Sequence, residues 1–112
     1  MLEKLERVTI QKDLYGPLLT DKQMQVLNWY YEHDLSLNEI ARHMKISKQA
    51  VYDLLKRSEK TLAEYEKRLG LVQRFQENRQ QLEAVCSLLE GPCDAEARNT
   101  ALQTLRSLLE SM

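Results

Sequence analysis

Glycine, proline, cysteine and histidine are all scarce in this chain of 112 residues, which has three glycines, two prolines, two cysteines and two histidines. So few glycines cannot form the glycine-rich loop that holds phosphates in nucleotide-binding enzymes. His33 and His43 are ten positions apart, and neither has cysteine or carboxylate partners at metal-ligand spacing. No Ser/His/Asp set or paired-carboxylate site can be assembled either. We therefore expect no catalysis, no cofactor and no bound metal.

The two cysteines do not form a metal or redox motif, because Cys86 and Cys93 lie on either side of Gly91-Pro92 rather than two residues apart. Cytosolic thiols stay reduced. We expect both side chains to be small buried hydrophobic residues. A disulfide and a zinc site are the alternatives.

Long hydrophobic runs are also absent from the start of the chain, where single leucines alternate with Glu3, Lys4, Glu6 and Arg7. Such a segment does not resemble a signal peptide or a membrane span. Hydrophobic residues make up 43% of the chain and charged residues 29%, which excludes a disordered protein. The composition thus predicts a folded, cytoplasmic protein with no membrane insertion.

Apolar residues recur with a period near 3.6 in every long segment, and no segment alternates with the period of two that strands require. The fold class is therefore predicted to be all-α. Pairs of breakers at Gly16-Pro17 and Gly91-Pro92 end helices, and Gly70 offers a left-handed C-cap. The expected helices cover about residues 2–15, 20–33, 36–44, 48–69, 71–90 and 94–112.

Capping residues mark the starts of these helices. Thr20 with Gln23, and Ser36 with Glu39, form two capping boxes in which each side chain satisfies the other residue's backbone N–H. Ser47 and Asp94 are the other expected N-caps. In the helix that begins after Thr20, we expect a buried face with aromatic residues in the core rather than in a base-stacking platform. The residues of this face are Met24, Leu27 and Tyr31, with Val26, Trp29 and Tyr30 beside it.

Heptad spacing distinguishes the second half of the chain. The three apolar stripes are Val51, Leu55, Ser58, Leu62, Tyr65 and Leu69; Leu71, Phe75, Asn78, Leu82, Val85 and Leu89; and Ala101, Leu105, Leu108 and Met112, with Leu102 and Leu109 beside it. We expect the heptad faces beyond Ser58 to pack together in a homodimer or against the last helix. The predicted organisation is a helix-turn-helix lobe at residues 1–69, with a long second helix that leads into a helical hairpin at residues 70–112 for packing or dimerisation.

The segment 36–56 has the pattern of a helix-turn-helix, in which a small residue must lie where the two helices meet. Ala41 and Val51, ten residues apart, occupy the two contact positions. Supporting apolar contacts are expected from Ile40, Met44, Ile46 and Leu54. The turn carries Lys45 where glycine is common, because the backbone there favours a positive φ.

If this module binds DNA, the first turns of its second helix enter the major groove. The solvent-facing residues that we expect to contact DNA are Ser47, Lys48, Gln49, Tyr52, Lys56 and Arg57. Gln49 could bind adenine with two hydrogen bonds, and Lys48 guanine or phosphate. Asp53 lies on the same face, where it would repel phosphates and pair with Lys56 or Arg57.

Charge is distributed unevenly along the chain. Residues 36–68 contain eight Lys/Arg and five Asp/Glu, whereas residues 1–35 and residues 69–112 each contain four basic and six acidic residues. The basic middle third suits nucleic acid, but the net charge of −1 predicts weak binding by a single protomer. The alternative is a helix-turn-helix that serves only protein packing.

Three stretches after Pro17, PLLTDKQ, DLSLNEIA and ISKQAVYDLLKRSEK, together resemble the YlxM family of helix-turn-helix proteins, found mainly in Gram-positive bacteria, and are similar to region 4 of bacterial sigma factors. The resemblance implies a non-catalytic regulatory protein whose DNA-binding motif is residues 36–56. Genes of this family usually lie beside those of the signal recognition particle GTPase and its receptor, which implies a part in that targeting pathway.

These observations predict a DNA-binding regulator that acts as a homodimer, with two recognition helices about 34 Å apart on DNA. One alternative is an adaptor that binds the signal recognition particle GTPase or its RNA. Another is a sigma-like fragment that docks on RNA polymerase.

Overall fold

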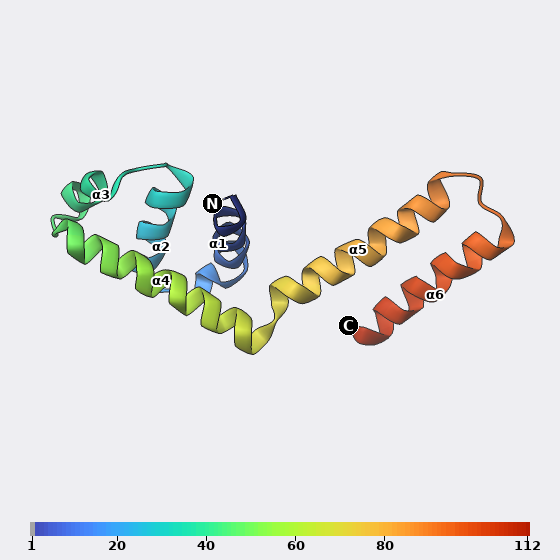
Figure 1. The fold of residues 1–112 in the computed structure, drawn as a ribbon. Coiled ribbons are helices and arrows are strands. Elements are labelled where there is room, and N and C mark those ends of the chain that lie inside the picture. Colours follow the sequence, from blue (N-terminus) through green and yellow to red (C-terminus); the bar gives the residue numbers. More distant parts are fainter. Residues whose placement is uncertain (1) are drawn as a thin grey trace. The chain divides into compact units, whose positions relative to one another are not determined.

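The computed structural model describes residues 2–112, and every regular element in that range is a helix (Figure 1). The predicted all-α class is confirmed. The chain divides into two compact units, of which the first extends to Val72 and the second covers Gln73–Met112. The helices are α1 (Leu2–Tyr15), a short 3₁₀ helix (Gly16–Leu18), α2 (Asp21–Leu27), a π-helical turn (Asn28–Glu32), α3 (Leu37–Met44), α4 (Lys48–Leu69), α5 (Leu71–Glu90) and α6 (Ala95–Ser111).

The helix ends follow the local signals in the sequence. The Oγ1 atom of Thr20 accepts a hydrogen bond from the backbone N–H of Gln23 at 3.2 Å, and the Oγ atom of Ser36 accepts one from Glu39 at 3.1 Å. Both capping boxes are complete, because the N3 side chain returns a bond to the N-cap backbone in each. The other predicted end signals are also present: Ser47 and Asp94 are N-caps, and Gly70 ends α4 with a φ of 62°.

The helix that begins after Thr20 departs from the prediction, because its second half is a π-helical turn at Asn28–Glu32. There the backbone N–H of His33 donates to the carbonyl of Asn28 at 3.0 Å, five residues earlier. The wider turn breaks the 3.6-residue register. Val26 and Leu27 are the fully buried residues of this segment, and the predicted buried residues Met24 and Tyr31 are only half-buried.

The core of the first unit is built around α4, which contacts α1, α2 and α3. Its buried residues are Val8, Tyr15, Val26, Leu27, Ile40, Val51, Leu55, Leu62 and Val72. Most of the heptad stripe of α4 therefore packs inside its own lobe, although its last member, Leu69, is exposed. For α4, the expectation that the heptad faces beyond Ser58 pack between subunits or against the last helix is wrong, since Leu62 is 0% exposed within this core. Ser58 is also buried, and its hydroxyl donates to the carbonyl of Leu54 at 2.7 Å.

An ion pair between a buried lysine and an exposed glutamate connects α1 to the π-helical turn. Lys12 is only 1% exposed, and its ammonium group contacts the carboxylate of Glu32. A buried ammonium needs such a partner, because its loss of hydration is otherwise uncompensated. Lys12 in turn lowers the pKa of Glu32.

The start of α5 is held by two side chains of the first unit. The buried Tyr15 donates its hydroxyl to Glu66 Oε1 at 2.5 Å and accepts the backbone N–H of Leu71 at 3.1 Å. The same Glu66 oxygen accepts the backbone N–H of Val72 at 2.9 Å. The first N–H groups of a helix have no partners within the helix. Tyr15 and Glu66 therefore act together as the cap of α5, although they come from α1 and α4.

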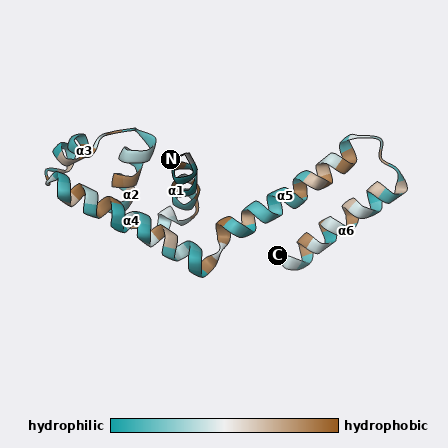
Figure 2. Ribbon diagram, in the orientation of Figure 1, coloured by the Kyte–Doolittle hydropathy of each residue, from teal (hydrophilic) through white to brown (hydrophobic). Residues whose placement is uncertain are grey.

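The second unit is a helical hairpin in which α5 and α6 are joined by residues 91–94. Hydrophobic residues recur along both helices (Figure 2). Only Val85, Ala101 and Leu108 are buried within this unit. Several members of the predicted stripes are exposed in this unit: Phe75, Leu82, Leu89 and Met112.

The exposure of the two cysteines differs from the expectation. Cys86 and Cys93 are both exposed free thiols rather than buried hydrophobic residues. Cys86 follows the buried Val85 on α5, so it lies off the inward side of that helix. Cys93 lies in the connection between α5 and α6.

The Tyr15 contact predicts a loss of stability at alkaline pH. Burial, together with the hydrogen bond to Glu66, raises the pKa of Tyr15 above its ordinary value of 10.0. The folded state therefore retains the phenolic proton when the unfolded state releases it, and the free energy of unfolding falls as the pH rises through 10. We expect Tyr15→Phe to lower the free energy of unfolding by about 1–3 kcal/mol near neutral pH, because the backbone N–H of Leu71 loses its acceptor.

Urea unfolding of both proteins, near neutral pH and above pH 10, checks this prediction. The difference between wild type and Tyr15→Phe should become smaller at the higher pH. Exposed Tyr30 offers the matched control, Tyr30→Phe, which should leave the pH dependence of the wild type unchanged. Parallel pH profiles for wild type and Tyr15→Phe would contradict the role given to this phenol.

Candidate nucleic-acid interface

Two short-linked helices, α3 and α4, form the helix-turn-helix, with only residues 45–47 between them. Lys45 has left-handed backbone angles (φ 58°, ψ 43°), and the backbone N–H of Ile46 donates to the carbonyl of Ala41 at 3.1 Å. This turn directs the chain from one helix into the next. Ile40 and Val51 are fully buried where the helices meet. Ala41, Met44 and Leu54 pack half-buried against this core as expected, whereas Ile46 is exposed.

One side of α4 faces solvent along its first three turns. We call this side the recognition face, and its members are Lys48, Gln49, Tyr52, Asp53, Lys56 and Arg57, all of them exposed. The opposite side carries Val51, Leu55 and Ser58, which lie in the interior of the first unit. The helical period of 3.6 residues separates the two sides. Five of the six residues predicted to contact DNA therefore lie together on an accessible surface, and the sixth, Ser47, adjoins them.

Two of these predicted residues have other contacts in the fold. The hydroxyl of Ser47 accepts the backbone N–H of Ala50 at 3.0 Å, so it caps α4. The ammonium group of Lys56 lies 3.5 Å from Glu59 Oε2 and 5.5 Å from the ring centre of Tyr52. Glu59 has a side chain only 12% exposed. These contacts hold the stem of Lys56 along the recognition face.

Lys4 on α1 is a basic residue near this face that the sequence did not identify. Its ammonium group lies 3.6 Å from Glu59 Oε1, and the hydroxyl of Tyr31 also donates to this carboxylate. Lys4 and Lys56 contact the two oxygens of the same carboxylate, and the neighbouring ammonium of Lys56 lowers the pKa of Lys4. Since these residues are separated by most of the lobe in sequence, no local pattern could have found the pair.

Asp53 has a different partner from the one expected. Its Oδ1 atom accepts a hydrogen bond from Gln49 Nε2 at 3.0 Å, one helical turn earlier. Lys56 contacts Glu59 instead. The prediction that Asp53 pairs with Lys56 or Arg57 is therefore wrong, and the carboxylate interacts with the residue that was expected to read a base.

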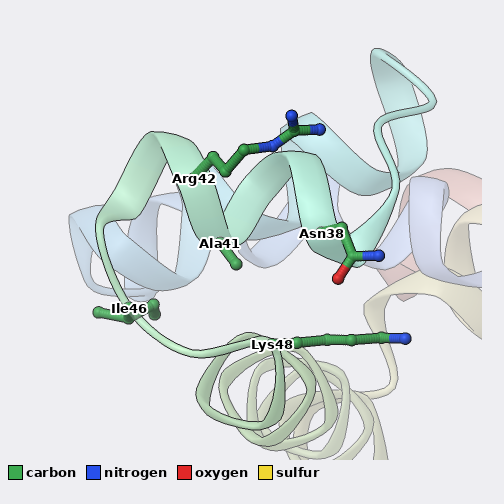
Figure 3. A pocket seen from close by; sticks show the side chains of 5 residues that line it. All are labelled: Asn38, Ala41, Arg42, Ile46 and Lys48. Carbon is green, nitrogen blue, oxygen red and sulfur yellow. The ribbon is translucent and has the colours of Figure 1, made fainter.

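A shallow groove separates α3 from the start of α4 (Figure 3). Its lining residues are Asn38, Ala41, Arg42, Ile46 and Lys48. Figure 3 shows the side chain of Lys48 extended along the groove on the side opposite Asn38. A second concavity, lined by Leu37, Lys48, Gln49 and Tyr52, adjoins it at Lys48. Asn38 and Arg42 are thus placed beside the recognition face, although sequence reasoning considered only the second helix.

Within residues 2–112, no three His, Cys, Asp or Glu side chains gather closely enough to hold a metal ion. No helix in this described range combines the length and the apolar character needed to cross a membrane. The exposed side chains around the start of α4 offer amide, phenol, ammonium, guanidinium and carboxylate groups for hydrogen bonding and charge interactions.

Comparison with known proteins agrees with the helix-turn-helix geometry. Residues 2–100 match the sequence model of UPF0122, described as "Putative helix-turn-helix protein, YlxM / p13 like". The chain belongs to this family. The resemblance to YlxM proteins that the sequence predicted is confirmed, and it extends over both units.

Members of UPF0122 from several bacteria are similar over most of their length. The relative from Bacillus licheniformis is 43% identical over 104 residues, covering 93% of this chain and 97% of the relative. The relative from Desulforamulus reducens is 42% identical over 96 residues, covering 86% and 82%. That from Bacillus cereus strain AH187 is 52% identical over 84 residues, covering 75% and 76%. UPF0122 is a helix-turn-helix family and not a known enzyme family, which is consistent with a DNA-binding role.

The left-handed backbone at Lys45 generates a prediction about stability. A β-branched residue tolerates this conformation poorly, whereas asparagine adopts it readily. We expect Lys45→Val to be less stable than Lys45→Asn by about 1–2 kcal/mol in urea unfolding. The matched control pair is Lys60→Val and Lys60→Asn at an exposed helical position, where the two residues have similar propensities. Equal stabilities for the two Lys45 variants would contradict a left-handed turn.

Proposed function

We propose that this protein is a cytoplasmic, DNA-binding helix-turn-helix regulator that acts as a homodimer and takes part in the signal recognition particle pathway. The observation that carries the DNA-binding part is the recognition face, an exposed polar surface on the first three turns of α4. In a helix-turn-helix, this part of the second helix enters the major groove. The opposite side of the helix is committed to the core, so the face has a fixed orientation on the lobe.

The roles of the side chains follow from their chemistry. Lys48 and Arg57 supply positive charge for phosphates, and Gln49 has an amide that can bind a base edge. Arg42, on the neighbouring helix α3, lies beside the groove that ends at Lys48 and adds a further cation. Lys4 does the same at the other end of the face, next to Lys56. Together these residues give one side of the lobe the cations that phosphate binding requires.

The homodimer is proposed to form through the second unit, because the heptad stripe of α4 is occupied within the first unit. Phe75, Leu82 and Leu89 are exposed on α5 at intervals of seven residues, and Leu102 and Leu109 are exposed on α6 at the same interval. A hairpin of about forty residues buries too little apolar surface to be stable alone. Packing two such hairpins together would cover these residues. A two-fold dimer would then offer two recognition faces to the half-sites of a palindrome.

The second candidate function is an adaptor that binds the signal recognition particle GTPase or its RNA. The exposed apolar residues of α5 and α6 favour this alternative, because a protein partner rather than a second copy would also cover them. The involvement of the targeting pathway rests on the resemblance to YlxM proteins alone. The adaptor requires no binding to duplex DNA, and this difference separates the two functions.

The DNA-binding proposal predicts a charge-dependent affinity for duplex DNA. We expect the double variant Lys48→Glu/Lys56→Glu to bind a mixed-sequence duplex much more weakly than wild type. The slope of log affinity against log salt concentration should fall by about 2, because two phosphate contacts are lost. Fluorescence anisotropy at several salt concentrations measures both quantities.

The matched control is Lys67→Glu/Arg68→Glu, which makes the same charge change at exposed positions in the last turn of α4. This control should keep most of the affinity. Equal losses in the two double variants would show a general charge effect and refute the recognition face. If wild type does not bind duplex DNA even at low salt, the adaptor becomes the better interpretation.

The dimer proposal predicts that Phe75→Glu/Leu82→Glu dissociates the protein. Each large apolar side chain buried in the interface contributes roughly 1.5–3 kcal/mol, so we expect dimerisation to weaken by two orders of magnitude or more. Sedimentation equilibrium measures the association constant. The control Gln76→Glu/Gln80→Glu adds the same charges at exposed positions of α5 and should have a much smaller effect. A monomeric wild type at all concentrations would refute the dimer.

A further inference from the structure

A hydrogen bond joins two side chains of the recognition face, Gln49 and Asp53, and it determines the orientation of the Gln49 amide. Gln49 Nε2 lies 3.0 Å from Asp53 Oδ1, and both residues are exposed. Gln49 is the second residue of α4, in the first turn that a helix-turn-helix places against base edges. Its side chain also lines the concavity that it shares with Leu37 and Tyr52.

A carboxylate fixes the orientation of an amide because it only accepts hydrogen bonds. The end of Gln49 that faces Asp53 must therefore be the NH₂ group, since the reverse orientation would place two oxygen acceptors against each other. One N–H is used by Asp53. When Asp53 accepts the N–H that points away from the carbonyl oxygen, that oxygen and the second N–H remain on one edge of the amide, as an acceptor and a donor side by side.

The nearby ammonium group of Lys56 does not compete with Gln49 for the carboxylate of Asp53. The ammonium group of Lys56 is held at Glu59 and over the ring of Tyr52. Asp53 is thereby available to Gln49, four residues earlier on the same helix, where side chains of an α-helix are neighbours. Because Glu59 binds Lys56, Asp53 accepts its hydrogen bond from the amide of Gln49.

We propose that Asp53 is a positioning residue that orients the Gln49 amide to recognise adenine in the major groove. This inference rests on the proposed DNA-binding function. Adenine presents a donor at N6 and an acceptor at N7, which match the carbonyl oxygen and the remaining N–H of Gln49. Guanine presents acceptors at both O6 and N7, so its O6 atom would face the carbonyl oxygen of Gln49. The oriented amide therefore favours adenine over guanine.

The negative charge of Asp53 has a second effect on binding. It repels phosphates of every sequence, so it lowers the affinity for DNA in general while it sharpens the choice of base. A residue that acted only through its charge would change the affinity and leave the base preference unaltered. The two effects can be separated, because base preference is a ratio of affinities measured with the same protein.

Selection of bound duplexes from a randomised pool, followed by affinity measurements on the selected site, tests this role. For wild type we expect enrichment of adenine at one position of the site, and an adenine-over-guanine affinity ratio of about ten or more there. Gln49→Ala should abolish this ratio. Asp53→Ala and the nearly isosteric Asp53→Asn should both bind all duplexes more tightly and reduce the ratio severalfold, because neither dictates which end of the amide faces outward.

Two further variants control the interpretation. Asp53→Glu retains a group that only accepts hydrogen bonds, so it should keep most of the adenine preference. Glu64→Asn removes an exposed carboxylate farther along α4, and it should leave the preference unchanged. Circular dichroism verifies that each variant is folded.

The outcomes distinguish this inference from the function on which it rests. Absence of duplex binding by wild type overturns both. Binding without enrichment of adenine, or an unchanged adenine-over-guanine ratio in Asp53→Asn and Asp53→Ala, overturns the positioning role alone. Loss of a cytosine preference in these variants would also overturn it, because that result would mean that Asp53 itself accepts from cytosine N4.

Discussion

The packing of α4 against three other helices of its lobe is the constraint on which the remaining structure depends. Val51, Leu55 and Leu62 are buried on one side of this helix, in contact with a core drawn from α1, α2 and α3. Because successive residues of a helix are rotated by a fixed angle, burial of this side determines which residues face solvent. The position of Gln49 and Lys48 on the surface is therefore a consequence of core packing rather than of their own interactions.

The same constraint decides which part of the chain remains available for association. A heptad stripe normally indicates a coiled-coil partner. In α4 the stripe is used within the lobe, with the hydroxyl of Ser58 bonded to its own helix at Leu54. On α5 and α6 several apolar residues at heptad spacing have no such cover, as Phe75 and Leu109 illustrate. Heptad spacing alone thus identifies a buried side of a helix, and the identity of the covering surface depends on the rest of the fold.

Features of this structure are predictable from the sequence when the residues that determine them are close together along the chain. Helix ends at Thr20, Ser36 and Gly70 were predictable because their signals lie within a few residues. The recognition face was predictable from helical period alone. The approach of Lys4 to Lys56 was not predictable, since it depends on a contact between distant segments. The π-helical turn at Asn28–Glu32 and the exposure of Cys86 have no signal in the apolar spacing or the breaker residues either. The bond from Gln49 to Asp53 is local, but a four-residue spacing also allowed pairing of Asp53 with Arg57.

The net charge of the chain is a poor guide to the charge of the recognition face, because the fold buries or pairs some of the charged groups. Lys12 is buried against Glu32, so the lysine contributes little to the field outside the lobe. Glu59 is largely covered and is shared by two ammonium groups, which leaves that cluster with an excess positive charge next to α4. A formal charge of −1 for the whole chain is therefore compatible with a locally basic side. On that side Asp53 is the exception, and its bond to Gln49 gives a physical reason for an acid at a position where phosphates would approach.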